Sequence, residues 1–204
     1  MSRQRTRPTR DETCDKLYEA AARVFEEQGI GNASIETIAA AAGFTRGAFY
    51  SNFKSKDELI IAMLEDHVER SIRRNLDLLA EHSNIDDFLD ALKNMDRSKQ
   101  DPLGRAPLLH MEMILFVARA EKRRPELAKR LRARRKLVTD IVETSLRNEG
   151  RKGLLNPAWT GAILLALEDG FRLHRLIDPE TTPADSFLRA ISDLRRALGI
   201  IATS

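Results

Sequence analysis

The sequence predicts an all-α protein of about nine helices, and three observations carry this prediction. Apolar residues recur at intervals of three and four along most of the 204 residues. Ala, Leu, Arg and Glu dominate, which favours helix over sheet, whereas aromatic residues make up only 5%. The alternation of apolar and polar residues that is typical of strands does not occur.

Punctuating residues place the first five helices. Gly29 and Gly31 are expected to end the first helix, and Gly43 ends the second. Short polar side chains that can accept a backbone N–H precede each of the next helices. The expected caps of the second to fifth helices are Ser34, Thr45, Ser55 and Asn84.

The remaining helices follow from loops and prolines. The stretch "DRSKQDPLGRAP", residues 96–107, predicts a loop, and a sixth helix runs through "LLHMEMILFVARA". Pro125 and Pro157 suit the first position of a seventh and an eighth helix, where a missing N–H costs nothing. A ninth helix is expected over roughly residues 184–198.

Composition limits the function classes. The formal net charge of +3 permits an anionic partner without requiring one. Cys14 is the only cysteine, so a disulfide within the chain is impossible and a reducing compartment is expected. Apolar runs stay well below 18 residues, and the basic start does not lead into a signal-peptide core. We therefore expect a cytoplasmic protein that binds no membrane.

The stretch "AAAAGFTRGAFYSNFKSKDEL", residues 39–59, predicts a helix-turn-helix. The alanines allow two helices to touch, and Gly43 suits a turn with positive φ. Phe44 and Phe49 can pin the second helix of the pair onto the first. The opposite face of that helix then stays exposed and can enter a major groove.

That exposed face carries residues suited to DNA. Arg46 can form a forked pair with guanine, and Gly47 and Ala48 let the backbone approach base edges. Tyr50, Lys54 and Lys56 are expected to reach phosphates.

The segment "GNASIETIAAAAGFTRGAFYSNFKSKDEL" resembles the DNA-binding signature of the tetracycline-repressor-like (TetR) family of bacterial transcription regulators. The pattern is a helix ending in I-A-x-x-A-G and a second ending in Y-x-x-F-x-x-K-x-x-L. The residues that match it are Ile38, Ala39, Ala42, Gly43, Tyr50, Phe53, Lys56 and Leu59. The signature covers about a quarter of the chain.

The resemblance implies a homodimer that binds a pseudo-palindromic double-stranded DNA operator, usually as a repressor, and a small-molecule effector that releases it. Arg46, Gly47, Ala48 and Tyr50 match the family's DNA contacts, Lys56 its phosphate-contacting lysine, and Thr45 its recognition-helix cap. Ser34 and Thr37 lie where backbone contacts are common. The implied domains are a flexible basic arm (1–10), a helix-turn-helix domain (11–54) and a helical effector-binding and dimerisation domain (55–204).

Two further sets of residues belong to the larger domain. An effector pocket is expected to be apolar, and its candidates are His67, Met113, Phe116, Trp159 and Ile163. The last two helices carry apolar seams that can build a four-helix dimer interface. One seam holds Ile163, Leu167, Gly170, Phe171 and His174, and the other Phe187, Ile191, Leu194 and Leu198.

Alternative functions stay open at this point. A regulator without a small ligand, controlled by its abundance or by a protein partner, fits the same motif. The arginine-rich arm is either disordered or lies in a minor groove. "AEKRRPELAKRLRARRKL" is interpreted as one helix with a solvated charged face, because its leucines recur at helical spacing.

An enzyme is the least favoured alternative. "HMEMI" lacks the H-E-x-x-H spacing, and no glycine-rich phosphate loop or nucleophile elbow occurs. Glu168, Asp169 and His174 are interpreted as a buried polar patch or dimer contact, and Cys14 as inert. No catalytic residue, metal or cofactor is expected.

Overall fold

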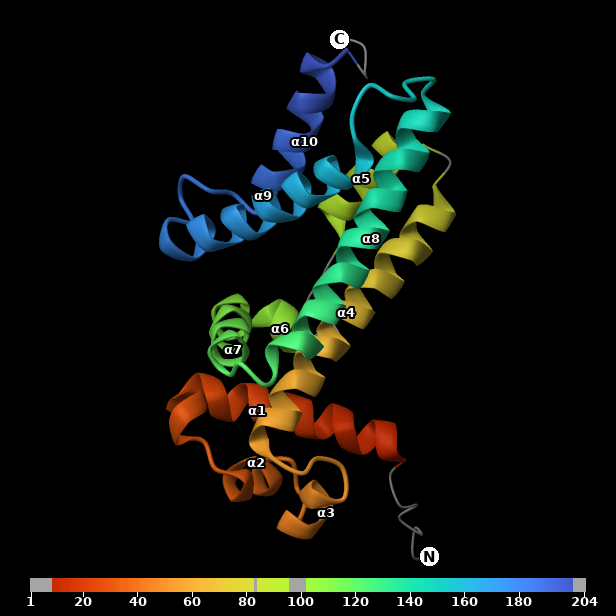
Figure 1. Ribbon diagram of the computed structural model, residues 1–204. Helices are drawn as coiled ribbons and strands as arrows, with labels where there is room; N and C mark the ends of the chain where they lie inside the picture. The colour runs from red at the N-terminus through yellow and green to blue at the C-terminus, as the bar shows by residue number, and fades with distance from the viewer. Residues whose placement is uncertain (1–8, 83, 96–101, 200–204) are drawn as a thin grey trace, which may run out of the picture. The chain divides into compact units, whose positions relative to one another are not determined.

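The computed structural model describes residues 9–82, 84–95 and 102–199 and is all-α, as the sequence predicts. Within these residues there are ten helices and no strand (Figure 1). The helices are α1 (Arg10–Asn32), α2 (Ile35–Ala41), α3 (Arg46–Tyr50), α4 (Lys56–Glu81), α5 (Ile85–Asn94), α6 (Pro102–Arg105), α7 (Pro107–Arg119), α8 (Arg124–Asn148), α9 (Pro157–Ile177) and α10 (Ser186–Ala197).

The chain forms two compact units. The first comprises residues 1–67 and 97–127, and the second residues 68–96 and 128–204. The domain boundaries expected from the sequence, 11–54 and 55–204, stay a prediction. This division follows contacts alone and assigns to the first unit the helices that pack against the helix-turn-helix.

The predicted caps form as expected. Ser34 Oγ accepts the Thr37 N–H at 3.0 Å, Asn84 Oδ1 accepts the Asp87 N–H at 2.9 Å, and Ser55 Oγ accepts the Glu58 N–H at 3.1 Å. Each bond satisfies one of the N–H groups that a helix start leaves without an intrahelical partner. The signals that were read from the sequence therefore position these helices.

Two predicted boundaries need correction. Thr9 caps α1 in a capping box with Glu12, so Thr9 and Arg10 belong to the helix and not to the arm. The rest of the predicted arm lies outside the described residues. The predicted loop 96–107 contains the short helix α6, because Pro102 and Leu103 are buried and anchor it. Its residues 96–101 also lie outside the described part.

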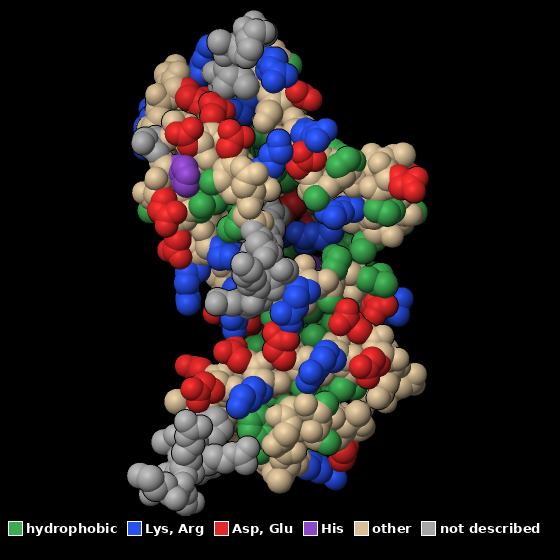
Figure 2. Space-filling model, turned by 180° about the vertical axis from the view of Figure 1, so that it is seen from behind, with side chains coloured by type: hydrophobic (Ala, Val, Ile, Leu, Met, Phe, Trp, Pro, Cys, Tyr) green, Lys and Arg blue, Asp and Glu red, His purple; other side chains and the backbone are tan. Residues whose placement is uncertain are grey.

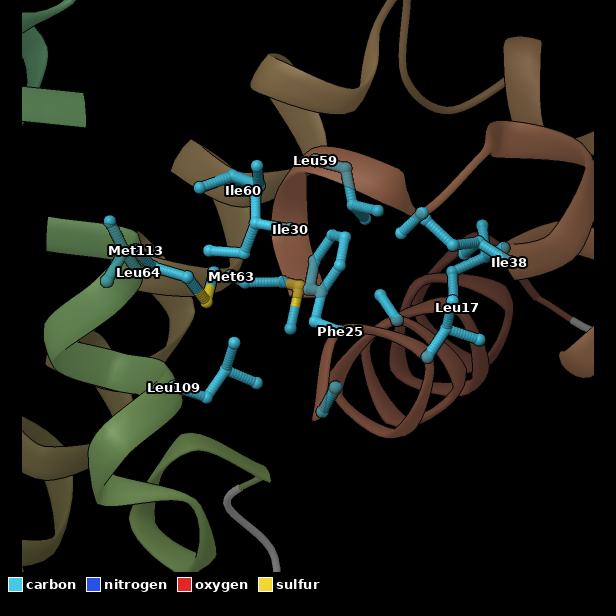
Figure 3. Close-up of a cluster of buried hydrophobic side chains, with 14 of the residues drawn as sticks. Leu17, Phe25, Ile30, Ile38, Leu59, Ile60, Met63, Leu64, Leu109 and Met113 are labelled. Carbon is cyan, nitrogen blue, oxygen red and sulfur yellow. The ribbon is translucent and has the colours of Figure 1, made fainter. Parts of the chain in front are cut away.

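A single apolar cluster holds the first unit together. Side chains from α1, α2, α4 and α7 point into the same interior, as Figure 3 shows. Gly29 adopts φ 77°, which bends the end of α1, so the predicted stop at this glycine is confirmed as a kink. The central members of the cluster are Leu17, Phe25, Ile38, Phe49, Leu59, Met63 and Met113.

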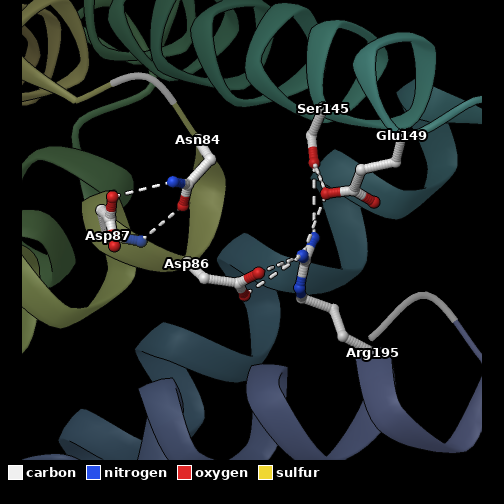
Figure 4. A network of polar contacts seen from close by, with 6 residues as sticks. All are labelled: Asn84, Asp86, Asp87, Ser145, Glu149 and Arg195. Carbon is white, nitrogen blue, oxygen red and sulfur yellow. Dashed lines mark hydrogen bonds and ion pairs between the residues drawn. The ribbon is translucent and has the colours of Figure 1, made fainter. Parts of the chain in front are cut away.

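The second unit relies on a close helix contact and on ion pairs. A Cβ at Gly161 would lie 2.9 Å from Thr139 Oγ1 and 3.1 Å from its backbone N, so α9 approaches α8 where only glycine fits. Arg195 of α10 reaches Glu149 of α8 at 2.9 Å and Asp86 of α5 at 3.2 Å (Figure 4). These contacts tie four helices together around few buried apolar side chains.

The charged helix α8 departs from its predicted faces. Arg134 is largely buried and bonds Glu168 at 2.7 Å, whereas Leu131 is 45% exposed. The leucine spacing in the sequence therefore does not mark a buried stripe here. Because Arg134 finds a carboxylate partner, the helix can turn a basic residue inward at little cost.

The charges of the molecule are dispersed. Figure 2 shows basic and acidic side chains interspersed over the face that it draws. This agrees with the modest net charge of +3 and locates no broad basic field on that face. None of the helices in the described part of the chain combines the length and apolar character that a bilayer span requires.

Candidate nucleic-acid interface

α2 and α3 meet at a tight turn centred on Gly43. Gly43 has φ 75°, a conformation that favours glycine, and its N–H donates to the Ala40 carbonyl at 3.0 Å. The Phe44 N–H donates to the Ala39 carbonyl at 2.8 Å, which closes the end of α2. The small residues of α2 and the glycine thus build the turn as the sequence predicts.

Helix α3 has one buried side and one exposed side. Phe49 is fully buried, with its ring centroid 5.8 Å from that of Phe53, and Phe44 packs partly against the same cluster. Arg46, Gly47 and Tyr50 are exposed on the other side. The prediction that the phenylalanines hold α3 and leave a free face is confirmed.

The cap of α3 is formed by its predicted residue. Thr45 Oγ1 accepts the Ala48 N–H at 3.2 Å. At the other end, Asn52 Nδ2 donates to the Ala48 carbonyl at 2.9 Å. A five-residue helix makes few hydrogen bonds of its own, so these side-chain bonds matter for its geometry. Asn52 was not anticipated, because an amide after a helix has no distinctive spacing.

Arg46 is held by two neighbours. Its Nη1 lies 3.0 Å from Glu36 Oε1 of α2, and its Cζ lies 5.4 Å from the ring centroid of Tyr50. Nη2 also donates to the Tyr50 hydroxyl at 3.5 Å. The bond to Tyr50 and then the Glu36 carboxylate raise the pKa of Arg46, so the guanidinium stays charged. Glu36 was not predicted to take part.

Lys56 has a different environment from the one expected. Its ammonium donates to the carbonyls of Ile30 at 2.6 Å, Ala33 at 2.9 Å and Gly31 at 3.3 Å. The lysine thus satisfies carbonyls at the end of α1. A phosphate contact by Lys56 would require some of these bonds to be exchanged, whereas the side chain of Lys54 is exposed.

Ser34 and Thr37 lie at the start of α2. Their hydroxyls are 2.7 Å apart and both residues are half-buried. The Ser34 hydroxyl is already engaged as the helix cap. Their predicted backbone contacts with DNA stay a prediction.

The predicted pocket residues have unlike surroundings. In the first unit, Met113 is buried, and the His67 ring stacks on the His110 ring at 4.4 Å. Phe116 is half-buried there. In the second unit, Trp159 and Ile163 are exposed. A small depression in the first unit is lined by other residues, namely Tyr18, Met63, Asp66, Pro102 and Leu103.

The apolar seams of α9 and α10 are largely solvent-facing. The exposed stripe on α9 runs at the alternating spacing of four and three, typical of a helix that packs against another. It consists of Trp159, Ile163, Ala166, Gly170, Leu173 and Ile177, with Gly170 open on its outer side. On α10, Leu194 and Leu198 are exposed and Phe187 and Ile191 half-buried.

The predicted α9 seam therefore shifts around the helix. Leu167 and Phe171 are half-buried, whereas Trp159, Leu173 and Ile177, which were not assigned to the seam, are exposed. The heptad spacing was available in the sequence as a signal. A cluster of half-buried neighbours is as apolar as an exposed stripe, which is why the sequence did not separate them.

Other candidate groups have structural roles. Arg134 and Arg172 bond Glu168 at 2.7 Å and 3.1 Å, which confirms its interpretation as part of a polar patch. Cys14 is half-buried with Sγ 3.8 Å from Asn52 Oδ1, and burial raises the pKa of its thiol. A raised pKa leaves less of the reactive thiolate.

The chain matches two family models. Residues 17–63 match "Bacterial regulatory proteins, tetR family", and residues 85–197, more than half of the chain, match "Tetracyclin repressor-like, C-terminal domain". The first match covers the helix-turn-helix described above.

Individual proteins resemble the chain in the same way. It is 31% identical to the HTH-type transcriptional regulator YfiR of Bacillus subtilis over 134 residues, 64% of this chain and 63% of YfiR. It is 38% identical to the regulator TtgR of Pseudomonas putida over 88 residues, 43% of this chain and 40% of TtgR. Each match thus spans less than two thirds of the relative.

A solved structure extends the likeness to the fold of nearly the whole chain. The regulator FadR of Bacillus subtilis, in complex with stearoyl-CoA, aligns with a TM-score of 0.63 and 17% identity, covering 92% of this chain and 98% of FadR. These relatives are regulators and not enzymes. The chain belongs to the TetR family of bacterial regulatory proteins and is a DNA-binding transcriptional regulator.

Proposed function

We propose that the protein is a ligand-responsive repressor that binds a pseudo-palindromic operator as a homodimer. The observation that carries this proposal is the division of α3: Phe49 is buried, whereas Arg46 and Tyr50 are exposed beside Gly47. A short helix that buries one aromatic ring and offers an arginine and a tyrosine outward is suited to a major groove.

Each exposed residue has a role in this proposal. Arg46 pairs with a guanine edge, and Gly47 and Ala48 let the backbone come close. Tyr50 and Lys54 contact phosphates, with Ser34 and Thr37 at the flank. Lys56 contributes chiefly by fixing the end of α1, because its ammonium is bonded to three carbonyls.

The test of this interface is Arg46→Ala. We expect operator affinity to fall by about 1–3 kcal/mol and base preference to relax at one position per half-site, because a forked contact is lost. Binding-site selection with the wild-type protein supplies the operator, and fluorescence anisotropy measures both proteins. Unchanged affinity and preference would show that α3 does not read bases through Arg46.

The proposed dimer uses the exposed stripe of α9 with the outer face of α10. Trp159, Ile163 and Ile177 are 69%, 54% and 76% exposed, which is unusual for large apolar side chains on one helix. Helices with heptad spacing from two copies form a four-helix interface about a two-fold axis. A dimer also sets two recognition helices about 34–36 Å apart, the spacing of successive major grooves.

An effector is the least direct part of the proposal. It is supported by the family and by FadR, whose structure holds stearoyl-CoA. We propose an apolar small molecule that shifts the dimer toward a spacing unsuited to the operator. α4 is suited to transmit this change, because it begins at Lys56 and continues without interruption to Glu81.

We expect effector and operator to oppose each other. Coupling of about 1–3 kcal/mol is usual, and by reciprocity operator DNA weakens effector binding by the same factor. A thermal-shift screen of small apolar compounds finds ligands, and each is then titrated into the protein–operator complex. A ligand that stabilises the protein without lowering operator affinity contradicts the coupling. A screen without any ligand favours control by abundance or by a protein partner.

A further inference from the structure

The recognition arginine is paired with an acid on the neighbouring helix. Arg46 Nη1 and Glu36 Oε1 are 3.0 Å apart, and the two side chains are 63% and 55% exposed. Glu36 stands in the first turn of α2, and Arg46 is the first residue of α3. The two halves of the helix-turn-helix are thus bridged on their solvent side.

This ion pair contributes little to folding. Exposed pairs are worth about 0–1 kcal/mol, because water solvates both partners and the long side chains lose freedom. The core of the first unit is already fixed by buried side chains such as Phe25, Ile38 and Phe49. The effect of Glu36 is therefore expected on what Arg46 can bind, and not on the stability of the fold.

Any DNA phosphate that approaches Arg46 competes with the Glu36 carboxylate. A phosphate offers a single charged acceptor, much like the one that Arg46 already has, and it is repelled by Glu36. A guanine edge is different, because it offers two neutral acceptors in the geometry of the guanidinium fork. The pair therefore penalises non-specific contact more than base readout.

We propose that Glu36 is a specificity-determining residue, which engages the Arg46 guanidinium in free protein and on non-operator DNA and yields it to a base edge in the operator. The proposal rests on the function proposed above, in which α3 reads the operator. It is a form of discrimination by repulsion, in which the wrong partner meets an unfavourable charge. Tyr50 keeps the guanidinium near this position when the ion pair opens, since the ring centroid is 5.4 Å from Cζ.

Glu36→Gln tests the proposal, because it removes the charge and keeps the shape. We expect affinity for a non-operator duplex to rise about 3- to 10-fold and affinity for the operator to rise less, so the ratio of the two falls. The slope of log affinity against log salt on the non-operator duplex should steepen by about 0.9, since one more cation then meets a phosphate. Anisotropy titrations on duplexes of equal length measure both.

Two controls separate the ion pair from a general change of charge. Glu26 is exposed on α1 of the same unit, and Glu26→Gln should leave the operator to non-operator ratio unchanged. In an Arg46→Ala background, Glu36→Gln should also leave the ratio unchanged, because no guanidinium remains to be released.

The outcomes are distinct. An unchanged ratio in Glu36→Gln overturns the proposal, as does a fall that persists in the Arg46→Ala background. A selective loss of operator affinity overturns it too, and instead indicates that Glu36 itself accepts from a cytosine amine. If the wild-type protein shows no operator preference, the proposed function fails first, and this proposal falls with it.

Discussion

Ile163→Glu is expected to convert the protein into a folded monomer and to lower operator affinity at least about 100-fold. Ile163 is 54% exposed in the middle of the α9 stripe, so a carboxylate there costs the isolated subunit little. In the proposed dimer, however, the charge would be buried against an apolar partner helix without a counter-ion. Two linked half-sites then become one weak half-site.

Sedimentation velocity measures the oligomeric state, and anisotropy measures operator binding. Leu131→Glu is the matched control, because Leu131 is also apolar and 45% exposed but lies on α8 outside the stripe. It should stay a dimer with normal operator affinity. Ile191 is a poorer target, since it is half-buried and a charge there would also destabilise the subunit. An intact Ile163→Glu dimer would remove α9 from the interface.

The helix-turn-helix was predictable because its signals are local. Ser34 and Thr45 act on N–H groups three residues away, and Gly43 acts through its own φ. The burial of Phe49 and the exposure of Arg46 follow from the helical period alone once those ends are fixed. None of these features depends on a distant part of the chain.

Contacts between distant residues were not predictable in the same way. The Lys56 ammonium bonds carbonyls more than twenty positions earlier, at Ile30, Gly31 and Ala33. In the sequence the lysine resembles any basic residue near DNA. Glu36 likewise reads as an ordinary exposed acid until the turn brings it to Arg46.

Helix α8 and the α9 stripe show a further limit. Periodicity identifies apolar positions but not what covers them, so Leu131 was expected to be buried and Ile177 was not expected to be exposed. Gly161 carried no signal either, because the need for glycine arises only from the approach of Thr139 on another helix. Such features follow from packing between helices and not from any one helix.

Phe49→Ala is expected to cost about 3–5 kcal/mol and to abolish operator binding. Phe49 is fully buried, and its ring lies 5.8 Å from the centroid of Phe53 and 5.7 Å from that of Tyr50. The loss is a large part of the about 5–15 kcal/mol that typically stabilises a protein. Because α3 has only five residues, little besides this burial keeps it helical.

Tyr50→Ala is the control that separates folding from binding, because Tyr50 is an adjacent ring that points outward and is 43% exposed. It should change stability by no more than about 0.5 kcal/mol and still weaken operator binding, since only a surface contact is lost. Urea unfolding gives the stabilities, and hydrogen exchange of residues 45–53 reports whether α3 is ordered. In Phe49→Ala these amides should exchange much faster than in the wild type, whereas in Tyr50→Ala they should stay protected. If Phe49→Ala kept both its unfolding midpoint and its protection, burial of the ring would not be what holds the recognition helix in place.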